Sequence, residues 1–288
     1  MKIARLRLGQ EIRLAVVADG RVSIPDDPAL DAAARDTAVL GTDPRVMEIL
    51  RAAADQRGPP GAEFELDKAD LLAPVARPGK IVAIGLNYRD HALEFGGPIP
   101  EEPLVFAKFS SSLCAPGAII TWDGRLTQSV DYEAELAVVI GRTARSVSEE
   151  EALACVLGYT CLNDVSARDL QFGDGQWVRG KSLDTFCPIG PWIVTPDELG
   201  DPTALEVRCT VSGALVQRGS TADMIFGVRA LISRLSTWFT LEPGDVIATG
   251  TPPGAGFFRE PKKLLRDGDV VEVTVEGIGT LRNPVKVL

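Results

Sequence analysis

The only histidine of the 288-residue chain, His91, lies three residues before Glu94. Imidazole is the one side chain that gains or loses a proton near neutral pH without help from its surroundings. Positions i and i+3 share one face of a helical turn, so Glu94 could orient His91 or share its proton. The pair therefore indicates acid–base chemistry, although a solvated histidine near the start of a helix would give the same local pattern.

Three acidic residues alternate along the segment 131–135. If this segment is a strand, Asp131, Glu133 and Glu135 project from one face, since alternate strand residues point the same way. Like charges on one face repel each other, yet the segment runs directly into the apolar residues 136–140. Carboxylates that enter a core need a counter-charge, which a divalent cation can supply. An acidic strand at a solvated sheet edge is the alternative.

A further acid, Asp164, follows the apolar stretch 155–162 and is expected at the end of a strand. Glu133, Glu135 and Asp164 form an all-oxygen set, which suits a hard ion that keeps open positions for water and substrate. Mg²⁺ or Mn²⁺ fits this set best. We therefore expect one divalent cation on these three carboxylates.

Residues 175–182 match the phosphate-binding pattern G-x-x-x-x-G-K-[ST]. That loop needs a buried strand before it and a helix after it, whereas polar residues precede this match and Pro188 and Pro191 follow it. We therefore reject the nucleotide-binding interpretation. Lys181 is then either a surface lysine or a cation that faces the acidic cluster and a substrate anion.

The segment 249–254 follows the apolar strand end Val246–Ala248 and is rich in small residues. Small residues let backbone N–H groups approach a ligand closely, and Thr251 could donate a hydrogen bond to a carboxylate. A plain turn explains the segment equally well.

Composition excludes several classes of function. A net charge of −10 and a pI near 4.8 argue against nucleic acid as a partner, because phosphate binding needs clustered Lys and Arg. No apolar run approaches the roughly 20 residues that span a bilayer, so no membrane partner is expected. The five cysteines form no C-x-x-C pair. With one histidine, a zinc site would need almost only cysteine ligands, and the cysteine spacing does not offer them. We expect a cytoplasmic protein with reduced thiols.

The elements that must position these residues are mostly short strands. Strands are expected over 2–8, 13–17, 81–84, 134–140, 192–194, 206–211 and 270–275, and helices over 44–54, 148–157 and 222–239. Glycine and proline at 57–61 break the chain and separate a small N-terminal module (1–70) from the main body (71–288). This pattern favours a β-rich α+β fold, a barrel or sandwich with helices packed outside.

These motifs follow the order found in the fumarylacetoacetate hydrolase family, which the chain resembles from about residue 81 to residue 285. The matching segments are 85–91 (GLNYRDH) with Glu94, 131–136 (DYEAEL), 163–169 (NDVSARD), 180–185 (GKSLDT), 249–252 (TGTP) and 277–283 (GIGTLRN). Each segment is weak evidence alone, but a chance match of all of them in order is negligible.

The resemblance implies a fold and a set of residue roles. The fold would be a mixed, barrel-like β-sandwich roll with peripheral helices, preceded by a small α/β module. Mg²⁺ or Mn²⁺ would bind Glu133, Glu135 and Asp164. The family's acid–base pair on a short lid carries over to His91 and Glu94, its lysine that binds substrate oxygen to Lys181, and its contacts to polar substrate groups to Arg168, Gln171 and Thr251. The family is usually homodimeric.

The resemblance also implies a small-molecule 2-oxo or 1,3-dicarbonyl acid as substrate. We expect hydrolysis of a C–C bond in an acylpyruvate-type acid, such as a fumarylpyruvate-like one, by water that His91 and Glu94 activate, with a metal-stabilised enolate as leaving group. The same site could decarboxylate oxaloacetate-like acids or isomerise 2-hydroxyhepta-2,4-diene-1,7-dioate, and the sequence leaves these reactions open. A catalytically silent binding protein is disfavoured, because a retired site has no physical reason to keep three mutually repelling acids.

Overall fold

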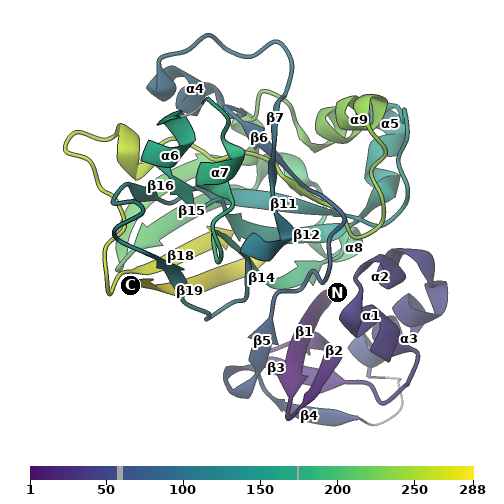
Figure 1. Ribbon diagram of the computed structural model, residues 1–288. Helices are drawn as coiled ribbons and strands as arrows, with labels where there is room; N and C mark the ends of the chain where they lie inside the picture. The colour runs from purple at the N-terminus through teal and green to yellow at the C-terminus, as the bar shows by residue number, and fades with distance from the viewer. Residues whose placement is uncertain (57–60, 174) are drawn as a thin grey trace.

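A computed structural model of the protein describes residues 1–56, 61–173 and 175–288. Its strands form one 12-stranded sheet, one five-stranded sheet and one two-stranded sheet. Figure 1 shows the N-terminal elements (purple) as a lobe beside the larger body of green and yellow strands. The expected β-rich α+β fold is confirmed, and the pairing of the described strands closes neither large sheet into a barrel. The expected chain break at 57–61 falls mainly on residues 57–60, which lie outside the described residues.

The N-terminal part forms one end of the large sheet. It contains the strands β1 (Lys2–Leu8), β2 (Glu11–Ala18), β3 (Arg21–Ile24) and β4 (Ala62–Glu65), the helices α1 (Leu30–Arg35), α2 (Ala38–Thr42) and α3 (Pro44–Ala54), and the 3₁₀ turn η1 (Leu66–Lys68). The strands predicted near 2–8 and 13–17 and the helix at 44–54 are confirmed. Helix α3 begins where the side chain of Asp43 accepts the N–H of Arg45, with Pro44 in the first turn.

The large sheet runs without a break from the N-terminal strands into the main body. Strand β1 pairs with β5 (Asp70–Leu72) and with β14 (Cys187–Val194). The sheet then continues through β12 (Val156–Asn163), β11 (Ala134–Ile140), β17 (Val246–Ala248), β6 (Ile81–Gly85) and β7 (Leu104–Lys108), while β8 (Leu113–Cys114) pairs with β14. The domain boundary expected at residue 70 therefore lies within one hydrogen-bonded sheet, and it stays a prediction.

Strand β11 lies between two hydrophobic cores, and all seven of its residues are buried. Leu136, Val138 and Ile140 pack in the core that includes the second sheet, whereas Ala137 and Val139 pack in the core that includes the N-terminal helices. This burial on both faces explains why the strand is apolar from Leu136 to Ile140, with Glu135 as its one charged residue. The second sheet has the order β16 (Ala214–Ser220), β15 (Glu206–Val211), β18 (Val270–Val275), β19 (Gly279–Val287) and β9 (Ile120–Trp122). The five strands predicted between residues 81 and 275 are confirmed.

The helix expected over 148–157 is wrong in its second half. Helix α5 (Glu149–Ala152) starts with a capping box between Ser148 and Glu151, and a single 3₁₀ turn, η3 (Leu153–Cys155), follows it. Strand β12 begins directly afterwards and pairs with β11 and β14. Burial in the middle of the sheet therefore decides the conformation here, and local helix propensity does not.

The helix expected over 222–239 starts later than predicted, as α9 (Val228–Trp238). The 3₁₀ turn η5 (Thr221–Asp223) precedes it, and Met224 forms a β-bridge with Tyr88. This bridge holds the chain extended before the helix. The remaining short elements outside the site are η2 (Ser110–Ser112), α8 (Pro196–Leu199) and η4 (Pro202–Ala204). In the described part of the chain, no helix is long and apolar enough to cross a membrane.

Asn87 connects three segments that are distant in sequence. Its side chain is buried, accepts the N–H of Phe226 (2.9 Å) and donates to the carbonyl groups of Phe226 (3.0 Å) and Thr249 (2.7 Å). The turn after β6 is thereby fixed against both the entry to α9 and the exit of β17. Asn87 thus determines where the segment that carries His91 starts.

Replacing Asn87 with alanine should lower the free energy of unfolding by about 2–4 kcal/mol, because buried backbone groups lose their partners. Urea denaturation measures this loss. The matched control Gln10→Ala changes an exposed turn residue and should stay within about 0.5 kcal/mol of the wild type. Equal stability of the two variants would contradict the role assigned to Asn87.

Candidate metal centre and active site

Glu133, Glu135 and Asp164 lie together, with one oxygen of each within 4.8 Å of the others, and all three are buried. Antiparallel pairing of β11 with β12 creates this cluster: Ala134 lies opposite Asn163, and the N–H of Asp164 donates to the carbonyl of Glu133 (2.9 Å). Asp164 follows the end of β12, as expected.

The expectation that Asp131, Glu133 and Glu135 lie on one strand is wrong. Asp131 ends the short strand β10 (Val130–Asp131), which pairs with β13 (Ser166–Ala167), and β11 starts only at Ala134. The break between the two strands turns Asp131 toward the backbone N–H groups of Gly256 and Phe257, and within the described ranges Asp131 shares only Arg168 with Glu133.

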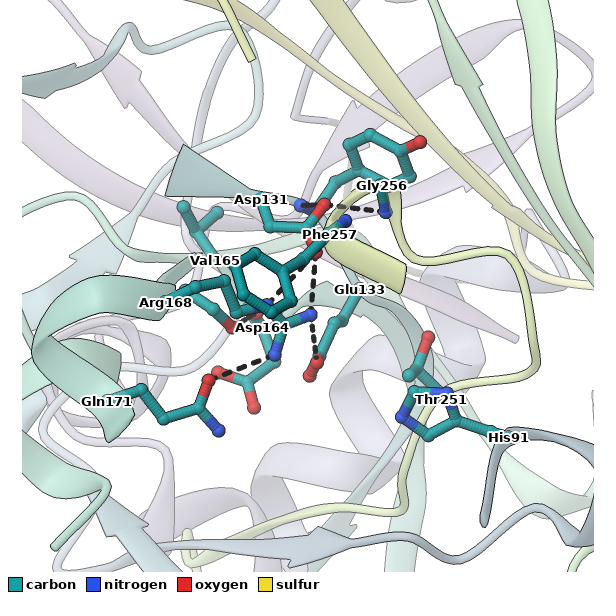
Figure 2. Close-up of polar contacts among 12 residues, drawn as sticks. His91, Asp131, Glu133, Asp164, Val165, Arg168, Gln171, Thr251, Gly256 and Phe257 are labelled. Atoms are coloured by element: carbon teal, nitrogen blue, oxygen red, sulfur yellow. Dashed lines mark hydrogen bonds and ion pairs between the residues drawn. The ribbon is translucent and has the colours of Figure 1, made fainter. Parts of the chain in front are cut away.

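Three cations surround the acidic cluster. Lys181 Nζ lies 2.6 Å from Glu133 Oε2 and 2.7 Å from Asp164 Oδ2, Lys108 Nζ lies 2.6 Å from Asp164 Oδ1, and Arg168 Nη2 lies 2.7 Å from Glu133 Oε1. Figure 2 shows Arg168 between Glu133 and Gln171. All three cations are almost completely buried, so these ion pairs are weakly screened by solvent.

Glu135 is the acid without a cation of its own. Its Oε2 accepts the N–H of Gly250 (2.8 Å), and among the described residues no Lys or Arg side chain forms an ion pair with it. Burial, with Asp164 and Glu133 close by, raises the pKa of Glu135 well above its usual range. A divalent cation would fit this all-oxygen set, in which one acid has no Lys or Arg partner among the described residues. In this structure Lys181 bridges the other two acids.

Neighbouring charges shift the pKa values of Glu133 and Lys181 in opposite directions, and both shifts favour the charged form. Burial opposes ionisation of Glu133, but Lys181 and Arg168 outweigh it and lower the pKa of this carboxyl below its usual range. Burial likewise opposes a charge on Lys181, but Asp164 and Glu133 raise the pKa of its ammonium group. Lys181 is therefore a permanent cation at neutral pH rather than a proton acceptor.

His91 and Glu94 lie on helix α4 (Arg89–Phe95), and His91 Nδ1 is 3.1 Å from Glu94 Oε2. Because Glu94 engages Nδ1, Nε2 is the ring nitrogen left for another partner. The N–H of Gly254 donates to both oxygens of Glu94 (3.2 Å each), and the ring of Phe258 packs edge-on against His91 at 5.7 Å. The helix is thus held down over the acidic cluster by a loop that follows β17.

The cavity between α4 and the acidic cluster is small, about 20 Å³, or room for about one water molecule. Its wall includes all the residues expected at the site except Glu94 and Asp164. The rest of the lining is largely apolar, with the aromatic residues Phe95, Phe106, Trp177 and Phe258. These four residues, which we call the aromatic roof, share the cavity wall with the charged groups of Glu133, Glu135, Arg168 and Lys181.

Three residues expected to contact substrate have protein partners as well. Arg168 and Gln171 lie on α6 (Arg168–Gly173), and Arg168 Nη1 donates to Gln171 Oε1 (3.0 Å). The Thr251 hydroxyl donates to the carbonyl of Ala134 (2.9 Å) instead of a carboxylate. The backbone N–H that does reach a carboxylate in this turn belongs to Gly250.

Sequence reasoning missed Lys108, at the end of β7. Besides Asp164, its ammonium group donates to the carbonyl groups of Val165 (3.4 Å) and Lys181. The available signal was a lone charged residue in the otherwise apolar segment Leu104–Phe109. Nothing local distinguishes such a lysine from one at a solvated strand end.

Lys181 ends the short helix α7 (Val178–Lys181), and α6, not a strand, precedes the phosphate-loop pattern. Gly180 lets α7 approach α6 closely, because a Cβ there would lie 2.6 Å from the Gln171 nitrogen and 2.7 Å from the Ala167 oxygen. The glycine thus serves helix packing next to the site.

Comparison with known proteins agrees with this geometry. Residues 80–286 match the sequence profile of the family described as fumarylacetoacetate (FAA) hydrolase C-terminal. A mitochondrial oxaloacetate tautomerase (fahd2) of Xenopus laevis is 47% identical over 217 residues, covering 75% of this chain and 68% of that protein. A 2-hydroxyhepta-2,4-diene-1,7-dioate isomerase from Mycobacterium marinum is 35% identical with a TM-score of 0.76, covering 100% of this chain and 98% of that chain. Maleylpyruvate hydrolase from Sphingobium sp. SYK-6, in complex with manganese(II) ion and pyruvate, is 31% identical with a TM-score of 0.79, covering 100% and 99%.

The fold and the site define a sheet-rich α+β enzyme with a buried acidic centre beneath a histidine–glutamate pair. The chain belongs to the fumarylacetoacetate hydrolase family. Its reaction is therefore of the hydrolase, decarboxylase or isomerase kind that this family spans. The buried acidic triad could bind a metal, as the manganese complex of the hydrolase illustrates.

Replacing Gly180 with alanine should separate α7 from α6 and lower the free energy of unfolding by about 1–3 kcal/mol, the usual cost of overpacking. The matched control is Gly173→Ala in α6, where the nearest atom to the new Cβ is 3.9 Å away. Urea denaturation should place the control close to the wild type. If both variants unfold at the same urea concentration, the close packing of α7 against α6 at Gly180 does not contribute to stability.

Proposed function

We propose that this chain catalyses proton transfer at the carbon beside the keto group of a short 2-oxo acid, as in keto–enol tautomerisation of an oxaloacetate-like acid. The observation that carries the proposal is that His91, a side chain able to move a proton, lines one cavity together with the acids Glu133 and Glu135. Proton transfer within one bound acid needs no second reactant, whereas hydrolysis needs a water molecule as well as the substrate. The oxaloacetate tautomerase relative supports the same substrate class. Decarboxylation of such acids would use the same site.

We propose that Glu133, Glu135 and Asp164 hold one Mg²⁺ or Mn²⁺ ion. Their oxygen donors suit either hard cation, and the lack of a Lys or Arg partner for Glu135 among the described residues leaves room for one. When bound, the cation would supply positive charge that favours loss of a proton from carbon next to a chelated carbonyl group. The manganese complex of maleylpyruvate hydrolase supports the same assignment.

The remaining roles follow from the protonation and position of each side chain. His91 would move the proton through Nε2, with Glu94 holding Nδ1 and stabilising the charged ring. Lys181, a permanent cation, would stabilise negative charge on substrate oxygen. Arg168, Gln171 and Thr251 line the cavity and would contact polar groups of the acid, and the aromatic roof would exclude water.

Hydrolysis of an acylpyruvate-type 1,3-dicarbonyl acid is the second candidate. In that reaction His91 would take a proton from water and hydroxide would add to the distal carbonyl carbon. The C–C bond would then break with its electron pair leaving as an enolate, which would take back the proton held by His91. The similarity to maleylpyruvate hydrolase and the presence of both His91 and Glu94 support this reading. Isomerisation of an unsaturated hydroxy-diacid needs only the proton shuttle and is supported by the isomerase.

The wider organisation of the protein is also a proposal. We assign residues 1–70 to a small module and 71–288 to the catalytic part, which contains every site residue. A homodimer is supported by β7, an edge strand of the large sheet with exposed Leu104 and Val105, and by the exposed Phe109 that follows it. A cytoplasmic location is supported by five free cysteines, all buried.

Manganese should raise the thermal unfolding midpoint by several degrees, since a ligand that binds only the folded protein stabilises it. Glu135→Gln should abolish this shift, because the cation loses one of its three ligands. The control variant Glu48→Gln alters an exposed carboxylate on α3 and should keep the full shift. A manganese shift that survives in Glu135→Gln would remove Glu135 from the ligand set.

His91→Ala should reduce turnover of oxaloacetate tautomers by about 10²- to 10⁴-fold, the usual contribution of a general acid–base group. Absorbance of the enol, recorded with Mg²⁺, measures the rate, and the manganese-induced thermal shift of the same variant serves as the control. Parallel assays with acetylpyruvate separate the two candidate reactions. Fast hydrolysis of acetylpyruvate by the wild type, with no tautomerase activity, would favour the second candidate over the first.

A further inference from the structure

The loop 254–258, which follows β17, holds helix α4 over the acidic cluster. Gly254 donates its N–H to Glu94, and the ring of Phe258 contacts both His91 (5.7 Å) and Phe95 (5.6 Å). The position of the histidine–glutamate pair therefore depends on where this loop lies.

The carboxylate of Asp131, which is completely buried, holds the middle of this loop. Its Oδ1 accepts the N–H of Gly256 (2.8 Å), and its Oδ2 accepts the N–H of Phe257 (3.0 Å), at the 3₁₀ turn η6 (Gly256–Phe258). Figure 2 shows Asp131 beside both residues. A Cβ at Gly256 would lie 2.8 Å from Asp131 Oδ1 and 2.0 Å from the Lys263 carbonyl oxygen, so only glycine allows this approach.

The same carboxylate also holds Arg168. Asp131 Oδ2 accepts Arg168 Nε (3.0 Å) and Nη2 (2.7 Å), and that Nη2 lies 2.7 Å from Glu133 Oε1. The guanidinium group additionally lies over the ring of Phe258, 5.3 Å from its centroid. Asp131 thus contacts two groups at once. One is the loop that holds helix α4, and the other is Arg168, which pairs with the proposed metal ligand Glu133.

We infer that Asp131 is a positioning residue, which sets His91 relative to the acidic cluster by holding the loop 254–258 and Arg168 in one arrangement. The inference rests on the proposed function for its catalytic consequence. Asp131 makes no contact with the cavity, so it acts through Phe258, Gly254 and Arg168. Small displacements of a catalytic group cost about 10²-fold in rate, and a loop with fewer fixed hydrogen bonds opens more often.

Asp131→Asn tests this role with little change of side-chain shape. The substitution replaces one acceptor oxygen with an NH₂ group, which cannot accept a hydrogen bond from the N–H groups that face it. Hydrogen exchange at residues 89–95 should become at least about tenfold faster, while residues 134–140 stay protected. With oxaloacetate, kcat should fall by about tenfold or more, and the manganese-induced thermal shift should remain because all three proposed ligands are unchanged.

The matched control is Asp245→Asn. Asp245 is also completely buried, accepts the N–H groups of Lys80 (2.8 Å) and Glu242 (2.7 Å), and pairs with Lys80 Nζ (2.6 Å), but it lies at the other end of β17. It should lose comparable global stability without faster exchange of residues 89–95. Equal exchange of these residues in the two variants would overturn the inference.

The exchange measurement needs no substrate, so it tests the positioning role even if the proposed reaction is wrong. Absence of oxaloacetate and acetylpyruvate turnover in the wild type would count against the proposed function alone. If Asp131→Asn does not fold, Gly256→Ala keeps the carboxylate and displaces the loop. It should give the same fast exchange at residues 89–95 and the same fall in kcat, and unchanged values would overturn the inference.

Discussion

Three carboxylates buried within 4.8 Å of one another constrain the rest of this structure. Their repulsion, in a place that excludes water, has to be offset by fixed positive charge. The pairing of β11 with β12 holds their backbone, and three other elements each bring one cation: Lys108 from β7, Arg168 from α6 and Lys181 from α7. Segments distant in sequence thus meet at one point, where their cations offset the repulsion between the acids.

This charge arrangement separates two chemical tasks. Lys108, Arg168 and Lys181 pair with Glu133 and Asp164, whereas the proposed proton carrier is His91, the single histidine, which lines the same cavity. A centre of this kind can serve tautomerisation, isomerisation or hydrolysis, since each starts by developing negative charge on a carbonyl oxygen. We propose that the access of water to the substrate distinguishes these reactions, and this access depends on the aromatic roof and on the loop that supports α4.

Short-range patterns in the sequence predicted seven of the described strands, helix α3 and the acids that cluster here, because alternation and caps are local properties. They failed at residues 153–157, where pairing with two neighbouring strands overrides helix propensity. They also failed at Asp131, because the strand that contains it ends there and β11 begins only at Ala134. Lys108 could not be predicted, since only the folded sheet reveals that its ammonium group is buried beside Asp164. Tertiary contacts, and not local sequence, determine these features.

The most direct test of the account is anomalous diffraction from crystals grown with Mn²⁺. The account predicts a single strong manganese peak bound by one oxygen each from Glu133, Glu135 and Asp164, at about 2.2 Å, with Lys181 Nζ moved out of its bridging position. A manganese peak bound elsewhere, or Lys181 still bridging Glu133 and Asp164 in crystals saturated with the metal, would contradict it.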